Sequence, residues 1–176
     1  MAVGIPSSNI TIRNLTVISP TSAGVCIGSE MSGGVSNVYV SQSTFINCST
    51  GIRIKTGRDR GGYVRDIHYD EIKISNSNSA AIMVNAFYGG SPVGCPATQQ
   101  YPPPSVSALT FSNIQVTADI GNSMQLSGLL DVPTEGVRVV NVSFVGNATY
   151  SCQGGVIGHA TALTPIPPPA CGLLEV

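Results

Sequence analysis

The stretch Ile10-Thr-Ile-Arg-Asn14-Leu-Thr-Val17 alternates apolar and polar residues on either side of a central asparagine. Four later stretches have the same form, and their central polar residues are Gln42, Glu71, Asn113 and Asn141. The five centres are separated by 28, 29, 42 and 28 residues. Because successive side chains of a strand point to opposite faces, this alternation predicts a series of β-strands at a fixed period.

A second apolar run follows each of these centres. The runs cover residues 24–28, 51–54, 81–84, 128–130 and 155–157. Each repeat is therefore expected to contain about three short strands separated by Gly, Ser and Asn turns. Repeats of ~20–50 residues are typical of solenoids and propellers.

The period favours a parallel β-helix of about five coils over a propeller, since about 28 residues are few for a four-stranded blade. The long interval contains an insertion loop at about 89–105, and a Gly- and Pro-rich tail covers about 158–176. We therefore expect a single, partial, all-β domain over residues 1–176. Stacked side chains of Asn14, Asn113 and Asn141 are expected to form a ladder at one corner, where their amides satisfy backbone groups of the turns.

Charge is scarce along the chain. It has 8 basic and 9 acidic residues, a net charge of −1 and 10% charged residues, against ~25% in an average soluble domain. This composition argues against nucleic-acid binding, which needs a basic excess. No run of ~18 apolar residues predicts a membrane span, and the first residues have neither the charges nor the apolar core of a signal peptide.

The five cysteines suggest different environments. Cys152 and Cys171 bracket a Gly- and Pro-rich segment and are candidates for a disulfide. Cys26 and Cys48 lie in apolar stretches and are expected to be small core residues. Cys95 lies in a loop, where we expect it to be unpaired. The cysteines give weak support for an oxidising compartment.

Five of the eight basic residues are concentrated between positions 53 and 65. Arg53 and Lys55 are two apart on a predicted strand, so their side chains share one face, and Ile52 and Ile54 point to the core. Two cations on one outer face form a site for an anionic group, because arginine donates two hydrogen bonds to a carboxylate. The alternative is an ordinary solvated basic patch.

The other three basic residues of this segment are Arg58, Arg60 and Arg65. We expect the nearby Asp59 and Asp66 to pair with them. His68 and His159 show no spacing typical of a metal site. The sequence therefore predicts no metal and no cofactor.

The motif Gly51-Ile-Arg-Ile-Lys-Thr56 resembles the Arg-Ile-Lys motif of the polygalacturonases, glycoside hydrolases of family 28. The stretch Ser22-Ala-Gly-Val-Cys-Ile-Gly-Ser-Glu-Met-Ser-Gly-Gly34 is similar to the preceding segment of plant members, and Gly61-Gly-Tyr-Val-Arg-Asp-Ile67 is similar to the segment that follows. The resemblance extends from about Ser8 to Tyr88 and is looser afterwards.

The resemblance implies a right-handed parallel β-helix that hydrolyses α-1,4 linkages between galacturonate units of pectin, with inversion. Arg53 and Lys55 match the residues that hold the substrate carboxylate. Tyr88 matches a tyrosine that lines the cleft, although a role as an amphipathic rim residue is an equal alternative. The resemblance also implies a secreted protein of the plant cell wall.

The chain departs from the family pattern at the catalytic motifs. Neither the Asn-Thr-Asp motif nor the Asp-Asp pair is present, and Ala23 stands where the family has a histidine. Inversion requires two carboxyl groups ~6.5–9.5 Å apart. We therefore assign no catalytic residue and expect a C-terminal half whose N-terminal coils are missing and which is inactive alone.

A solenoid without its first coils exposes a strand edge and apolar core, so we expect self-association through that end. Two further interpretations of the isolated chain stay open. One is a non-catalytic module that binds pectin or another acidic glycan, and the other is a structural solenoid without a ligand. A pectate lyase is disfavoured, because no cluster of calcium-binding carboxylates is found.

Overall fold

The computed structural model describes residues 4–58, 60–89, 102–117, 122–146 and 148–175. In chain order the elements are β1 (Ser7–Arg13), β2 (Thr16–Ile18), β3 (Ala23–Ile27), β4 (Val35–Ile46), β5 (Thr50–Lys55), β6 (Tyr63–Ser75), β7 (Ala80–Asn85), β8 (Ser105–Thr117), β9 (Asn122–Ser127), β10 (Thr134–Phe144), β11 (Tyr150–Cys152), β12 (Val156–Thr164), the 3-10 helix η1 (Pro169–Cys171) and β13 (Leu173–Glu175). No helix in these ranges is long and apolar enough to cross a bilayer.

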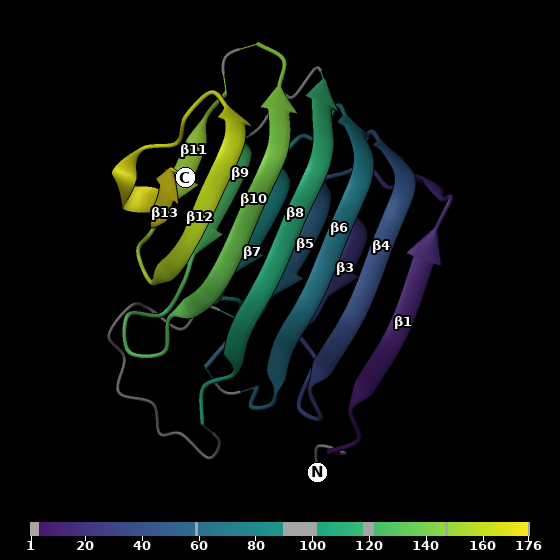
Figure 1. The fold of residues 1–176 in the computed structure, drawn as a ribbon. Helices are drawn as coiled ribbons and strands as arrows, with labels where there is room; N and C mark the ends of the chain where they lie inside the picture. Colours follow the sequence, from purple (N-terminus) through teal and green to yellow (C-terminus); the bar gives the residue numbers. More distant parts are fainter. Residues whose placement is uncertain (1–3, 59, 90–101, 118–121, 147, 176) are drawn as a thin grey trace.

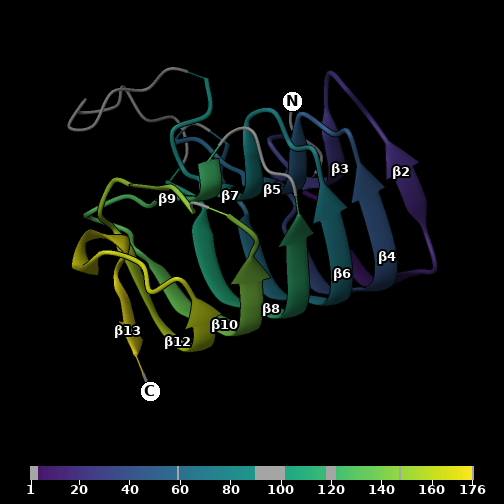
Figure 2. The same ribbon diagram turned by 90° about the horizontal axis from the view of Figure 1, so that it is seen from above.

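The strands form two parallel sheets that face each other across the core (Figures 1 and 2). The large sheet has the order β1-β4-β6-β8-β10-β12-β13, with β2 also beside β4. The small sheet has the order β11-β9-β7-β5-β3. The chain passes from one sheet to the other and back, and each passage adds a strand in parallel register with the last. The prediction of an all-β parallel β-helix is therefore confirmed.

Each long strand bends at the polar centre of its repeat. Asn14, Gln42, Glu71, Asn113 and Asn141 all have positive φ, between 50° and 57°. A second bend lies five residues earlier, and its residues with positive φ are Asn9, Asn37, Asp66, Ala108 and Gly136. Left-handed backbone is enriched in Asn, Asp and Gly. The second to fifth repeats thus have one long bent strand and one short strand, whereas the first repeat has the three short strands that the sequence suggested, β1, β2 and β3.

Side chains at the bends hydrogen-bond from coil to coil. The amide of Asn141 donates to Asn113 Oδ1 over 2.8 Å, and the amide of Asn113 donates to Asp70 Oδ1 over 2.8 Å. The predicted ladder is therefore correct for Asn113 and Asn141, which bond to side chains and not to turn backbone. Asn14 makes no side-chain bond to either of them, because Gln42 and Glu71 occupy the corresponding bends of the coils between.

The core is filled by the alternate residues that point inward from both sheets. Tyr69 and Phe111 stack with their ring centroids 5.8 Å apart. In the small sheet, Ile52 and Ile54 are almost completely buried, as the alternation predicts. Burial of such side chains stabilises the fold by ~25 cal/mol per Å² of apolar surface.

Two of the five apolar runs that were predicted to follow the polar centres do not form the short strand of their coil. Residues 24–28, 51–54 and 81–84 correspond to β3, β5 and β7. The run at 128–130, however, follows the strand of its coil, which is β9. The sequence pattern did not predict β9, because Met124 and Leu126 are its only apolar residues. The run at 155–157 begins β12 of the large sheet.

The predicted insertion at about 89–105 lies mostly outside the described residues, and β8 begins at Ser105. Cys95 also lies outside them. Of the predicted tail at about 158–176, residues 158–164 belong to β12, and a segment containing η1 leads to β13. The disulfide Cys152–Cys171 is present and connects β11 to η1.

The first coil is incompletely covered. Ile10 lies in register with Val38 of β4, yet Ile10 is 37% exposed and Val38 is 3% exposed. Leu15 and Ile18 beside it are also exposed. Among the described strands, β1 and β3 have a neighbour on one side only, which leaves apolar side chains and unpaired backbone groups at this end.

Removing the carboxylate of Asp70 is expected to lower the free energy of unfolding by about 1–2 kcal/mol, towards the lower value because the group is partly exposed. Asp70 accepts hydrogen bonds from Ser112 Oγ (2.7 Å), Asn113 Nδ2 (2.8 Å) and Tyr39 Oη (3.1 Å). Burial acts to raise the pKa of Asp70, but these hydrogen bonds outweigh it and hold the pKa below its ordinary value.

A depressed pKa means that this stabilisation is fully present above the unfolded-state value of about 3.9 and is lost as the pH falls below it. In urea unfolding, the difference between the wild type and Asp70→Ala should therefore shrink below about pH 4. The variant Glu135→Ala, at an exposed position, is the control, and its difference from the wild type should not shrink in this way. A difference that is independent of pH would contradict the proposed hydrogen-bonded role.

Loss of the disulfide is expected to cost about 3 kcal/mol, because Cys152 and Cys171 close a loop of 19 residues in the unfolded chain. The double variant Cys152→Ser, Cys171→Ser should melt at a lower temperature in circular dichroism. Cys26→Ser is the matched control, since Cys26 is free and exposed. Equal melting temperatures for the two variants would show that the bridge does not stabilise the fold.

Candidate functional site

Strand β5 presents two cations on the outer face of the small sheet. Because Ile52 and Ile54 fill the core positions, Arg53 and Lys55 point outward, as the alternation predicts. Both side chains are half-buried. The Nε of Arg53 is buried and has no hydrogen-bond acceptor among the described residues. A buried donor without an acceptor costs about 1–3 kcal/mol.

Tyr88 lies over both cations. It follows β7 by three residues, and its ring centroid is 4.4 Å from Lys55 Nζ and 5.6 Å from Arg53 Cζ. Both distances are within the ~6 Å range of cation–π attraction. The structure thus brings together Arg53, Lys55 and Tyr88, the three residues that the sequence suggested for substrate binding.

The parallel register extends this outer face across neighbouring strands. Arg53 is paired with Cys26 of β3 on one side and with Met83 of β7 on the other. The expectation that Cys26 is a core residue is wrong: Val25 and Ile27 take the inward positions, and the thiol is exposed. Partial burial raises the pKa of the Cys26 thiol against the opposing effect of Lys55 and Arg53, so it is a neutral neighbour of the two cations.

The remaining cations of the basic segment are paired with carboxylates. Arg58 Nη1 donates to Asp131 Oδ2 over 2.8 Å, and Arg58 Nη2 donates to Asp131 Oδ1 over 2.6 Å. Arg60 pairs with Glu30. Arg65 lies 4.0 Å from Asp66 and also packs on the Tyr63 ring.

The expected pairing is therefore found for Arg65 and Asp66 alone, while Asp59 lies outside the described residues. Arg58 and Arg60 have carboxylate partners from other coils, Asp131 and Glu30, which sequence proximity did not suggest. Within the described ranges, Arg53 and Lys55 have no carboxylate partner. They are therefore the cations of this segment that remain available to an anionic ligand.

The described residues offer no pair of free carboxyl groups at this face. Glu30, Asp66 and Asp131, the carboxylates that contact the basic segment, are each paired with an arginine. Asp70 is occupied by the hydrogen bonds at the bends of the large sheet. No group of three or more His, Cys, Asp or Glu side chains in the described part of the chain has the arrangement of a metal site.

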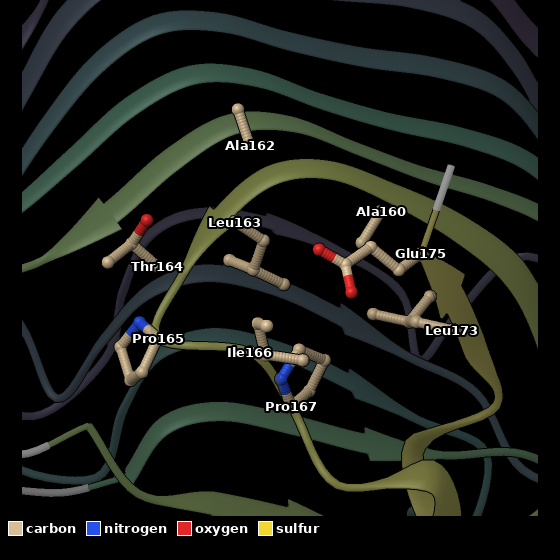
Figure 3. A pocket seen from close by; sticks show the side chains of 9 residues that line it. All are labelled: Ala160, Ala162, Leu163, Thr164, Pro165, Ile166, Pro167, Leu173 and Glu175. Carbon is tan, nitrogen blue, oxygen red and sulfur yellow. The ribbon is translucent and has the colours of Figure 1, made fainter.

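Two of the hollows lined by described residues lie away from this face. The larger, of about 340 Å³, lies between β12, β13 and the segment 164–167 and is lined mainly by alanine, leucine, isoleucine and proline side chains (Figure 3). The other, of about 280 Å³, lies on the large sheet and is lined by Arg138, Val140, His159 and Thr161. The larger hollow has no cation among its lining residues and does not suit an anionic ligand.

The stacked coils define a parallel β-helix protein, and this one has a cationic outer face. Comparison with known proteins shows to which family it belongs. The family model described as "Glycosyl hydrolases family 28" matches residues 1–161. The chain belongs to glycoside hydrolase family 28.

Its relatives and structural neighbours agree with this assignment. A "Probable polygalacturonase" of Vitis vinifera is 33% identical over 95% of the chain, and a "Polygalacturonase" of Chamaecyparis obtusa is 33% identical over 81%. The crystal structure of a hyperthermoactive exopolygalacturonase from Thermotoga maritima superposes on 91% of the chain with a TM-score of 0.81 and 25% identity. The chain spans only about a third of the length of these proteins: 34%, 28% and 34%, respectively.

Proposed function

We propose that the chain forms the uronate-binding part of a polygalacturonase-type glycoside hydrolase that cleaves pectic galacturonan. The main support for this proposal is the pair Arg53 and Lys55. The two side chains lie on the outer face beneath Tyr88 and have no carboxylate partner among the described residues. Membership of family 28 and the names of the relatives support this substrate.

The chemistry of the three side chains suits a galacturonate unit. A guanidinium forks onto a carboxylate, and the compact ammonium of lysine adds a point charge beside it. The aromatic ring of Tyr88 packs on both cations and restricts their rotamers before a ligand arrives. Substrate orientation through the carboxylate is thus assigned to Arg53 and Lys55, and the lining of the cleft to Tyr88.

We assign no catalytic acid or base to the chain itself. The three carboxylates that contact the basic segment are each paired with an arginine, and inversion requires two carboxyl groups ~6.5–9.5 Å apart. The same observation favours the second candidate, a β-helix module that binds acidic glycans without cleaving them. Both candidates predict that the chain alone binds polygalacturonate without cleaving it, so release of reducing ends by the chain would contradict the absence of an assigned acid and base.

We place the site of action outside the cell, in the pectin of the cell wall, where the proposed substrate is found. The disulfide Cys152–Cys171 supports an oxidising compartment.

Arg53→Ala is expected to weaken binding of an oligogalacturonate about tenfold to a hundredfold in isothermal titration calorimetry, since a charge-assisted hydrogen bond contributes roughly 1.5–3 kcal/mol. Affinity of the wild type should also fall with added salt, because the site is open to solvent. Arg138→Ala on the large sheet is the matched control and should bind like the wild type. Equal affinities for the two variants would refute the site.

The open end of the first coil is expected to cause self-association. Sedimentation velocity should show oligomers whose fraction grows with concentration, because Ile10, Leu15 and Ile18 are exposed beside unpaired strand edges. The double variant Ile10→Lys, Leu15→Lys should be monomeric, while Ile157→Lys, on β12 near the other end, should behave like the wild type. A wild type that is monomeric at all concentrations contradicts this expectation.

A further inference from the structure

A bidentate ion pair bridges the two coils on either side of Tyr88. Arg58 follows β5 by three residues, and Asp131 follows β9 by four. Two parallel hydrogen bonds, of 2.8 Å and 2.6 Å, join the guanidinium to the carboxylate. Strand β7 lies between β5 and β9 in the small sheet (Figure 2), so the pair spans one whole coil.

The coil that is spanned carries Tyr88, and its backbone is held from both sides. On the β5 side, Tyr88 N donates to Thr56 O over 2.9 Å. A Cβ atom on Gly57 would lie 2.4 Å from Tyr88 O, so this contact is possible only for glycine. On the β9 side, Ala86 N donates to Ser127 O over 2.9 Å. Segment 86–88 is therefore enclosed by the two segments that the ion pair joins.

The Arg58 guanidinium is not suited to hold a ligand itself. Its side chain is only 11% exposed, and both of its terminal nitrogens are directed to Asp131. The pair Arg60–Glu30 differs, because it lies at the surface. The fork, whose guanidinium is buried and whose carboxylate is 57% exposed, thus has the features of a structural link beside the site.

We propose that the Arg58–Asp131 ion pair positions Tyr88 over Arg53 and Lys55 and so preorganises the uronate site. This inference rests on the proposed function only for the identity of the ligand. Arg58 and Asp131 are positioning residues: they act through segment 86–88. By neutralising Arg58, Asp131 also leaves the positive charge of this face concentrated at Arg53 and Lys55.

The ionisation of Asp131 agrees with this role. Its hydrogen bonds from Arg58 hold the pKa of Asp131 below its ordinary value, so the carboxylate stays charged at neutral and mildly acidic pH. The Arg58–Asp131 ion pair is therefore present under the conditions in which binding is measured.

Tryptophan fluorescence can test the position of residue 88 without any ligand, because the chain contains no Trp. In the single-tryptophan background Tyr88→Trp, Asp131→Asn removes the charge at nearly constant size and turns one acceptor of the fork into a donor. We expect faster rotation of the introduced indole, seen as lower anisotropy, and about threefold to tenfold weaker binding of trigalacturonate. Glu30→Gln, which breaks the exposed ion pair with Arg60, should change neither quantity.

The outcomes separate the inference from the proposed function. If Asp131→Asn leaves the anisotropy of the indole unchanged, the positioning role is overturned, whatever happens to binding. If the anisotropy of the indole falls but none of the proteins, wild type included, binds trigalacturonate, the positioning role stands and the proposed function fails. Asp131→Glu, which keeps the charge but displaces the carboxylate, provides the same comparison if Asp131→Asn is too unstable to purify. A lower melting temperature with unchanged anisotropy would assign the ion pair to stability alone.

Discussion

Backbone hydrogen bonds between successive coils hold the strands of both sheets in parallel register, and the position of each side chain follows from that register. A residue of one coil lies beside the corresponding residue of the next, about 4.8 Å away. Apolar residues at inward positions therefore stack into a continuous core, as the paired residues Val38, Ile67 and Leu109 do. The same rule aligns polar residues outside, so that Arg53 lies between Cys26 and Met83.

The stacking of coils also imposes backbone conformations that some of the residues do not favour by themselves. Left-handed backbone is expected at Asn113 and Asn141, but Gln42, Glu71 and Ala108 adopt it as well. A residue at a bend must follow the coils on either side, because a different φ would break the hydrogen bonds of its whole strand. The cost of about 1 kcal/mol or more at each such residue is offset by the pairing that it preserves.

Much of the fold could be predicted because the information is local and periodic. The repeat of about 28 residues and the alternation around Arg53 and Lys55 need no knowledge of distant contacts. The partners of the arginines were not predictable in this way. Arg58 and Asp131 are 73 residues apart, and their meeting depends on the number of coils between them. Strand β9 was missed because it has few apolar residues, and its neighbours in the sheet define it more than its own sequence does.

Stacking in one dimension gives the two flanks of the uronate site different mechanical support. In a solenoid each coil is stabilised mainly by its nearest neighbours, so opening begins at an end and proceeds inward. On one side β5 is backed by β7, β9 and β11; on the other, the described chain provides β3 alone. Fraying of a single coil would thus expose the edge of the strand that carries Arg53 and Lys55. Tyr88 is one coil further from that end, which places the aromatic ring on the more rigid side of the site.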